Sequence, residues 1–486
     1  MNRLSPVLIF TALALTGHLH GQEAKPARDP FLAPPEEILA LIPDDTGGVA
    51  QVSLQLDWIS LPHADANRLI RQELKSSQDA TALRKAVDGM IAAKKATLLD
   101  INTLIVRGGQ RSKLETIGEK PYPTEFDPPG IPQSFGTSTG PAFPTNPTTP
   151  NIFTFRNIGH TVEVEATVGE DRATIDLNLA PEWIEHLADI IWSPDTRECQ
   201  QPVFHHCKMS GQLLARSGVW QLAGLFTPPS WPVKDTPAEL MPLPDHRVML
   251  FIRATVHGAE NAAPADSSVK QCGLLAEWIE LDQQILSVLL NANQPAGKAD
   301  ALRAALQPHL ADGSAKLIET TFLQCRGGQR SKIESGREYP YPTEFDPPAI
   351  IPDTDSESPA PSSTAAIARN LRLTNATPNS FTVRNLGVTM EYECTVGESG
   401  VTIDLNIAPE FVTFTGLDSF GRGASTVLQP RFHTMKQTAQ LLVRAGQTVL
   451  YGTFDPPPAP EAAPRTTARP PVKMDRRVVL FVRPVL

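Results

Sequence analysis

The sequence has no excess of basic residues, few cysteines and no long apolar run. Asp and Glu (53) outnumber Lys and Arg (43), which gives a formal net charge of −10. Nonspecific nucleic-acid binding needs a basic surface that neutralises phosphates, so we expect no nucleic acid among the partners. The apolar run Val7–Leu15 is too short for a transmembrane helix, which takes about 20 apolar residues, and no later stretch qualifies. The five cysteines are an odd number and cannot form a complete set of intramolecular disulfides.

The N-terminus has the pattern of a secretory signal peptide. Arg3 precedes the apolar run, and the more polar Thr16-Gly17-His18 follows it. We expect cleavage near Gly21 and no lipid anchor, because no cysteine lies near that position. The sequence therefore predicts an exported chain.

The motifs of common enzymes are also missing. RGGQRSK (107–113) lacks the Lys-Ser/Thr ending and the following helix of a phosphate loop. We find no nucleophile elbow, no His/Asp/Ser constellation and no dinucleotide fingerprint. We therefore expect no enzymatic activity, no cofactor and no small-molecule substrate.

One stretch of the chain occurs twice. RGGQRSKLETIGEKPYPTEFDPP begins at Arg107, and RGGQRSKIESGREYPYPTEFDPP begins at Arg326, 219 residues later. A shared run of this length indicates an internal duplication. Trp58 and Trp278 correspond at nearly the same spacing, and we expect both to fill a core between helices and strands.

Each copy carries the same series of patterns. Val52, Leu54 and Leu56 alternate with polar residues, which predicts a strand, and apolar residues at helical spacing over 63–95 predict two helices. Strand patterns follow, with turns at glycines. The prolines of PYPTEFDPP lack backbone donors, so this segment should lie at a sheet edge or cross it. The predicted fold class is α+β and dominated by strands: two tandem units, each a strand, two helices and then about six mainly antiparallel strands in long hairpins.

The expected division of the chain follows from this repeat and from proline-rich segments. It comprises a signal peptide (1–21), a Pro-rich leader (22–48), unit 1 (49–258, with a Pro-rich insertion at 127–150), a linker (259–270) and unit 2 (271–486, with a Pro-rich insertion at 347–378).

Both units resemble the secretin family, the ring-forming outer-membrane channels of type II and type III secretion and type IV pilus systems. The segments that carry the resemblance are ALRKAVDGMIAAKKATLLDINTLIVRGGQRSKLE, the KPYP and YPYP motifs, VRNLGVTMEYECTVGESGVTIDLNI, LQPRFHTMKQTAQLLVRAGQTVLYGTF and RRVVLFVRPVL. The resemblance implies two diverged tandem secretin domains. It implies a non-enzymatic structural component of a secretion or pilus-type assembly.

The chain also departs from the family pattern. Where a secretin has two adjacent glycines, this chain has Ala223-Gly224 and Tyr451-Gly452, and Pro-rich segments follow each of them. A second function therefore stays open, namely a periplasmic binding scaffold derived from a secretin that no longer forms a pore.

The expected partners are the chain itself or a true secretin, which would pair through exposed β-strand edges. Glu163, Glu165, Asp176 and Asn178 should lie on the outer face of the sheet, and their polarity suits a water-facing surface better than a lipid-facing one. We therefore expect the protein in the periplasm or at the periplasmic face of the outer membrane, with outer-membrane association possible through a partner.

Two acidic pairs are candidates for chemistry. Glu125 with Asp127, and Glu344 with Asp346, could act as an acid–base pair or bind calcium. A hydrolase would have to use them. The flanking prolines favour a structural role in turns instead.

A second candidate group joins histidine and cysteine. His205, His206 and Cys207, with Cys199 nearby, are residue types that bind zinc. Adjacent side chains on a strand face opposite sides, so His205 and His206 should diverge. The equivalent segment of unit 2 keeps only His433. We expect no metal site, and a Cys199–Cys207 disulfide is the more favoured interpretation in an oxidising compartment. The other cysteines should be buried thiols.

Overall fold

The computed structural model describes residues 50–129, 148–192, 199–230, 244–257, 270–293, 298–352, 371–458 and 475–486. The predicted signal peptide and Pro-rich leader, nearly all of the predicted linker, and most of both Pro-rich insertions lie outside the described residues. Val49–Leu486 forms one compact body, which contains both of the repeated units.

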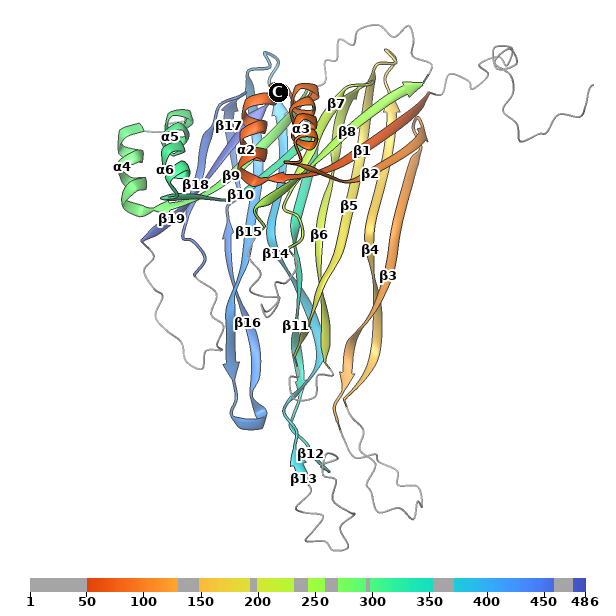
Figure 1. The fold of residues 1–486 in the computed structure, drawn as a ribbon, viewed down its shortest axis with the longest axis vertical. Helices are drawn as coiled ribbons and strands as arrows, with labels where there is room; N and C mark the ends of the chain where they lie inside the picture. Colours follow the sequence, from red (N-terminus) through yellow and green to blue (C-terminus); the bar gives the residue numbers. More distant parts are fainter. Residues whose placement is uncertain are drawn as a thin grey trace, which may run out of the picture. The chain divides into compact units, whose positions relative to one another are not determined.

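Each unit has a strand, then helices, then a series of strands (Figure 1). Unit 1 contains β1 (Gln51–Pro62), α2 (His63–Glu73), α3 (Thr81–Ala92), β2 (Thr97–Arg107), β3 (Arg111–Asp127), β4 (Thr149–Val168), β5 (Thr174–Ile191), β6 (Gln200–Arg216), β7 (Trp220–Phe226) and β8 (His246–His257). Unit 2 contains β9 (Gln271–Asp282), α4 (Gln283–Asn293), α5 (Asp300–Ala305), α6 (Gln307–Asp312), β10 (Ala315–Arg326), β11 (Arg330–Asp346), β12 (Ile350–Pro352), β13 (Leu371–Leu373), β14 (Thr377–Val396), β15 (Thr402–Phe420), β16 (Val427–Lys436), β17 (Ala439–Arg444), β18 (Val449–Phe454) and β19 (Arg476–Val485).

The fold class is α+β and dominated by antiparallel strands, as the sequence predicts. Seven strands follow the helices in unit 1, where about six were predicted. Among the described α-helices and strands, unit 2 differs in three places: its helical segment contains α4, α5 and α6, the short pair β12–β13 is added, and the strand that corresponds to β6 is divided into β16 and β17. Unit 2 also has a short 3-10 helix at Gly423–Ser425.

Two sheets contain strands from both units. The eight-stranded sheet has the order β18-β19-β9-β10-β7-β8-β1-β2. In the second sheet β3, β4, β5, β6, β11, β14 and β15 pair in succession, and both β16 and β17 pair with β15. A single bridge between Glu125 and Ser380 also joins β3 to β14. Besides this bridge, paired strands join the units in both sheets, where β7 pairs with β10 and where β6 pairs with β11.

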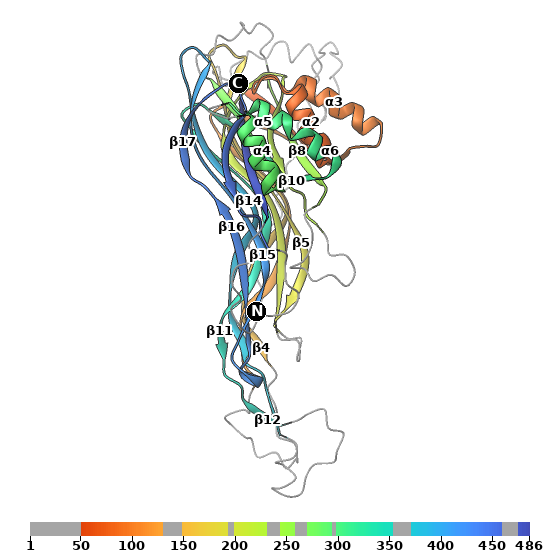
Figure 2. The same ribbon diagram turned by 90° about the vertical axis from the view of Figure 1, so that its left-hand side faces the viewer.

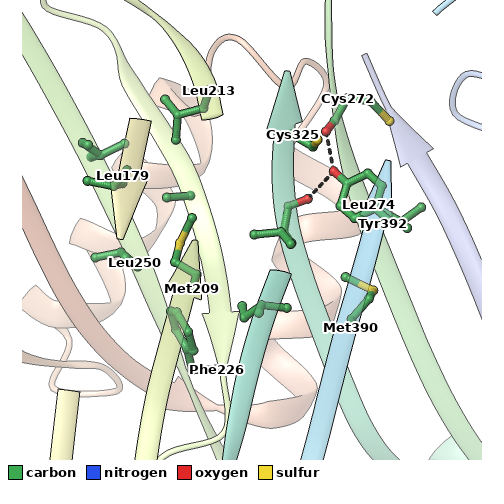
Figure 3. Close-up of a cluster of buried hydrophobic side chains, with 14 of the residues drawn as sticks. Leu179, Met209, Leu213, Phe226, Leu250, Cys272, Leu274, Cys325, Met390 and Tyr392 are labelled. Carbon is green, nitrogen blue, oxygen red and sulfur yellow. Dashed lines mark hydrogen bonds between the residues drawn. The ribbon is translucent and has the colours of Figure 1, made fainter. Parts of the chain in front are cut away.

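The main core lies between the two sheets. Period-two alternation places Val52, Leu54 and Leu56 on the face of β1 that joins this core, as predicted. Trp58 and Trp278 are fully buried in the same cluster, Trp58 beside Phe226, so they fill the space between the sheets. The expectation that they lie between helices and strands is wrong, because the next residue, Ile59, is the one that faces the helices. Figure 3 shows part of this core.

Tyr392 ties the two sheets together through the core. Its hydroxyl donates to the backbone oxygen of Cys272 at 2.6 Å and lies 2.9 Å from the backbone oxygen of Leu323 (Figure 3). Tyr392 belongs to β14, whereas Cys272 and Leu323 belong to β9 and β10 of the other sheet. The buried hydroxyl is therefore satisfied, as burial of a polar group requires.

The helices cover the outer face of the eight-stranded sheet (Figure 2). Helices α2 and α3 pack through Leu69, Ile70 and Leu83 onto strands of both units, including Phe322 of β10. Helices α4, α5 and α6 pack mainly on β9 and β19 of unit 2. No helix among the described residues has both the length and the apolar character needed to cross a membrane.

The long hairpins owe their geometry to glycines and prolines at equivalent positions. Gly159 in β4 and Gly387 in β14 have φ values of +121° and +125°. A Cβ at Gly159 would lie 2.2 Å from the backbone oxygen of Thr116, so only glycine fits. The prolines of PYP (121–123 and 340–342) lie in β3 and β11 where each pairs on one side only, with β4 and with β14. This agrees with the predicted edge position.

Candidate functional site

The paired acids lie at the far ends of the long hairpins. Asn151 donates to Asp127 at 3.0 Å, and in unit 2 Asn379 donates to Asp346 at 3.2 Å. Glu125 and Glu344 both stand opposite Ser380 in the strand register. Each aspartate thus accepts a hydrogen bond from the neighbouring strand of its own hairpin, at a strand end where the sequence predicted a turn.

The histidine and cysteine residues of β6 separate onto two faces, as the strand period predicts. His205 Nε2 lies 2.9 Å from the backbone oxygen of Thr227, and the Cys207 thiol lies 3.4 Å from the same oxygen. His206 faces the other way, with Nδ1 3.6 Å from Glu338. Burial lowers the pKa of His205 to about 3, so the ring is neutral at physiological pH. No group of metal-binding residues occurs in the described ranges.

The expected Cys199–Cys207 disulfide is wrong. Both thiols are buried in different places: Cys199 Sγ contacts the backbone oxygen of Pro378 at 3.7 Å, and Cys207 contacts Thr227. Cys199 immediately precedes β6, and Cys207 lies within it. Eight residues of extended strand span about 26 Å, whereas a disulfide needs Cα atoms within about 7 Å.

The two units of the described chain are joined by paired strands, and we call this contact the junction. In one sheet the β6–β11 register runs from Ser210 opposite Lys332 to Phe204 opposite Glu338. In the other sheet Leu225 and Gly224 of β7 stand opposite Phe322 and Leu323 of β10. Two sheets are therefore continued across the junction by backbone pairing.

A buried ion pair crosses the junction between β8 of unit 1 and β10 of unit 2. Arg247 of unit 1 donates to Glu319 of unit 2 at 2.9 Å, and both side chains are at most 1% exposed. Thr227 donates to the second carboxylate oxygen of Glu319 at 2.8 Å. Next to this pair, His63 Nε2 lies 2.8 Å from the Thr320 hydroxyl, and burial, with the nearby Arg247, lowers the pKa of His63 to about 2.

A second buried carboxylate, that of Glu277, draws partners from both units. Arg71 and Asn67 of α2 donate to it at 2.7 and 2.8 Å, and Arg303 of α5 donates at 2.8 Å. Burial alone would raise the pKa of Glu277, but Arg303, Arg71 and the hydrogen bonds outweigh it and lower this pKa. The carboxylate therefore stays charged and holds α2 of unit 1 against unit 2. The equivalent acid in unit 1, Asp57, pairs with Arg84 at 2.7 Å.

The turn between α2 and α3 also contacts the junction, near the start of β9. Gln271 at the start of β9 donates to the Ser77 backbone oxygen at 3.0 Å and accepts from the Leu214 backbone at 2.7 Å. Gln271 is 1% exposed. Its equivalent in unit 1, Gln51, is exposed.

Elsewhere in the described chain, the strands that correspond to the junction strands have no paired strand on their outer sides, apart from the single Glu125–Ser380 bridge near the end of β3. They form a β2–β3 edge, which corresponds to β10 and β11, and a β16–β18 edge, which corresponds to β6 and β7. In Figure 1, β3 and β16 lie at opposite sides of their sheet. The difference in exposure is large: Ile105 of β2 is 67% exposed, whereas Gln324, at the equivalent position of β10, is 1% exposed. Likewise Leu442 is 74% exposed and Leu214 is 6% exposed.

Sequence reasoning anticipated pairing through strand edges but did not find the junction residues. The signal was present in the repeat, because Asp57 and Arg84 recur as Glu277 and Arg303 at spacings of 220 and 219 residues. An acid and an arginine that recur together in both repeats are candidates for an ion pair that each unit forms.

Fold and site together define a strand-dominated protein whose two repeated units are joined edge to edge. No protein-family model and no curated protein sequence matches this chain. The similar solved structures are secretins. The secretin in the pilotin–secretin complex of ETEC is 11% identical, with a TM-score of 0.23, and the match covers 46% of this chain and 53% of that one.

Two further secretins give similar values. The type II secretin of enteropathogenic Escherichia coli is 10% identical over 45% of this chain and 73% of that one, with a TM-score of 0.22. The type IV competence pilus secretin of V. cholerae is 15% identical over 49% and 66%, with a TM-score of 0.17. This chain spans about half the length of the ETEC secretin. The arguments below rest on this chain's own geometry.

Proposed function

We propose that this protein is a non-enzymatic, secretin-like structural component of an outer-membrane protein secretion or pilus-type assembly. It consists of two tandem secretin-like units, 49–258 and 271–486, and acts by association through its strand edges. One observation carries the proposal. The chain joins its own units by edge pairing in both sheets, and the equivalent edges at the two sides expose backbone and apolar side chains.

The chemistry of the buried groups supports a structural role. His63 and His205, whose pKa values are strongly lowered by burial, are buried side chains that contact a hydroxyl and a backbone oxygen. A cleft lined by α2, α6 and the start of β10 lies over the Glu277 network. Of its three arginines, Arg71 and Arg303 pair with Glu277, and Arg68 pairs with Asp65. Such an arrangement stabilises the junction.

Export to the periplasm or to the periplasmic face of the outer membrane belongs to the same proposal. The predicted signal peptide supports it, and so do the charged pairs on the outer face of the larger sheet around Glu163 and Asp176. Glu163 lies on that face beside Arg111 and Lys113, and Asp176 pairs with Arg326. Charged pairs of this kind suit a surface in contact with water.

A periplasmic scaffold that no longer forms a pore is the second candidate. The division between β16 and β17 favours it, because the edge is interrupted at Gln437 and Thr438. Gln437 donates instead to the backbone oxygen of Tyr451 at 3.0 Å. A strand with a break offers a shorter continuous template for pairing.

Size analysis of the native protein tests the proposal. Envelopes extracted in mild detergent should contain the protein in a large, heat-resistant oligomer, and images of the purified mature protein should show rings. A defined complex with one other envelope protein, without self-association, would support the scaffold. A soluble monomer without envelope partners would contradict both candidates.

A further inference from the structure

We infer that the partner of the free edges is a second copy of this chain, docked head to tail. The β2–β3 edge of one copy pairs with the β16–β18 edge of the next, in the register that joins the two units within the chain. This inference rests on the proposed function and deepens it, because it names the partner, the strands and the register.

The repeat transfers the internal register to the free edges residue by residue. Within the chain, Glu334 of β11 stands opposite Lys208 of β6. The equivalent residues are Glu115 of β3 and Lys436 of β16, so the opposite charges are kept. A cross-strand pair of opposite charges stabilises this register.

The neighbours of these charges are also repeated. Lys113 lies 2.6 Å from Glu115, as Lys332 lies 2.8 Å from Glu334. On the other side, Lys436 lies 2.9 Å from Glu410, and Lys208 contacts Glu182, the equivalent of Glu410, at 4.0 Å. The free edges therefore already hold their side chains in much the same pattern as the paired ones.

The second sheet supplies a charge pair of the same kind. The residues equivalent to Arg247 and Glu319 are Arg477 at the start of β19 and Asp100 of β2. Arg477 now contacts Asp455 at 3.2 Å, and Asp100 contacts His160 at 3.4 Å. All four side chains of these two contacts retain some exposure, from 17% for His160 to 70% for Asp455. Docking would bring Arg477 and Asp100 together as Arg247 and Glu319 are in the junction.

Apolar side chains match across the proposed contact. Helix α2 buries Leu69 and Ile70 against strands of both units. The equivalent residues of α4, Leu289 and Leu290, are only partly buried. The β2–β3 edge exposes Ile101 and Ile105 at positions where β10 is covered. A docked copy would cover the α4 residues and the β2 isoleucines, as apolar groups favour.

The interruption of the edge falls within the surface that a partner would contact. Met209 and Ser210 lie in the uninterrupted β6 and stand opposite Ile333 and Lys332. Their equivalents are Gln437 and Thr438, which separate β16 from β17. The strand is thus continuous where it has a partner on its outer side and broken where it has none.

The contact joins two different surfaces, and this decides the geometry of the assembly. A twofold dimer would pair β3 with β3, whereas the junction pairs a β3-like strand with a β6-like strand. Association of unlike surfaces repeats from copy to copy and gives rings or filaments. Every copy then contributes one permanent junction and one that forms between chains.

Cysteine cross-linking of the mature full-length protein tests the register. Glu115→Cys and Lys436→Cys in one chain should give a ladder of disulfide-linked dimers, trimers and larger species under mild oxidation. Opposite residues in antiparallel strands have Cα atoms about 4.5–5.5 Å apart, which suits a disulfide. The native cysteines are buried and are the same in all variants.

Three controls make the result specific. Glu115→Cys with Gln440→Cys places the thiols about 13 Å out of register and should give no ladder. Glu115→Cys alone should give no dimer, whereas twofold pairing of β3 would produce one. A mixture of the two single variants should stop at dimers, because each chain then carries one reactive edge.

The outcomes separate the inference from the proposed function. A ladder from the matched pair, with none from the out-of-register pair, supports head-to-tail docking. A large envelope oligomer without that ladder overturns the inference and leaves the proposed function standing. A disulfide-linked dimer from Glu115→Cys alone, or equal ladders from both pairs, also overturns it. A monomer throughout refutes both.

Discussion

The junction ion pair yields the sharpest stability prediction. Glu319→Gln removes the charge opposite Arg247, whose side chain is 0% exposed. Removing one partner of a buried ion pair typically destabilises a protein by about 3–5 kcal/mol, because the remaining charge stays desolvated. Glutamine still offers an oxygen to Thr227, so we expect about 3 kcal/mol. This loss is a large part of the free energy of unfolding of a typical domain, which is roughly 5–15 kcal/mol.

The repeat provides the control. Asp100 is equivalent to Glu319 but is 36% exposed in the isolated chain, so Asp100→Asn should change the free energy of unfolding by less than about 1 kcal/mol. Urea unfolding followed by tryptophan fluorescence measures both variants against the wild-type protein. Equal effects of the two substitutions, or a Glu319→Gln effect below about 1 kcal/mol, would refute the reasoning that the buried pair holds the units together.

Four further outcomes can be measured. Acidification from pH 7 to pH 5 should lower the free energy of unfolding by about 2 kcal/mol for each of His63 and His205, because their pKa values are about 2 and about 3 in the fold and near 6.5 when unfolded. This stability is present above pH 6.5 and is lost as the pH falls. Glutamine at both positions should remove that part of the pH dependence in urea titrations. The buried cysteines should resist alkylation at pH 8 until urea unfolds the chain, as mass spectrometry would show. Gly159→Ala should destabilise by more than about 2 kcal/mol in urea titrations, whereas Gly89→Ala in α3, where a Cβ meets no atom within 4 Å, should not. Ile105→Gln should lower the oligomer fraction in size-exclusion chromatography and leave the monomer's thermal midpoint unchanged, because this side chain is 67% exposed.

The order of strands and helices could be predicted because it depends on local patterns. Alternation in β1, glycine at the turns and the proline motif in β3 each constrain the backbone of a few neighbouring residues. Gly109, which was expected in a turn, indeed has a φ of +74°. The repeat then extended each local prediction to the second unit.

Contacts between distant elements were harder to predict, and the errors show why. The period of β1 indicates that Trp58 and Ile59 face opposite sides, but it does not tell which side the helices cover. The proposed disulfide considered the chemistry of Cys199 and Cys207 without the length of the strand between them. The junction itself depends on the register of β6 against β11, which no local pattern sets.

The two kinds of edge differ in composition in the direction that the proposed head-to-tail docking would explain. At the junction, Thr320 and Gln324 of β10 make polar contacts to α2 and to the turn after it. At the free edge the equivalent residues are Ile101 and Ile105. Units within one chain are already held close together, so their contact needs little additional free energy. Separate chains lose translational and rotational freedom, at a cost of roughly 4–15 kcal/mol, and apolar burial is the general means of offsetting it. Isoleucine at the free edge and polar residues at the tethered one are therefore what head-to-tail assembly of a duplicated chain requires.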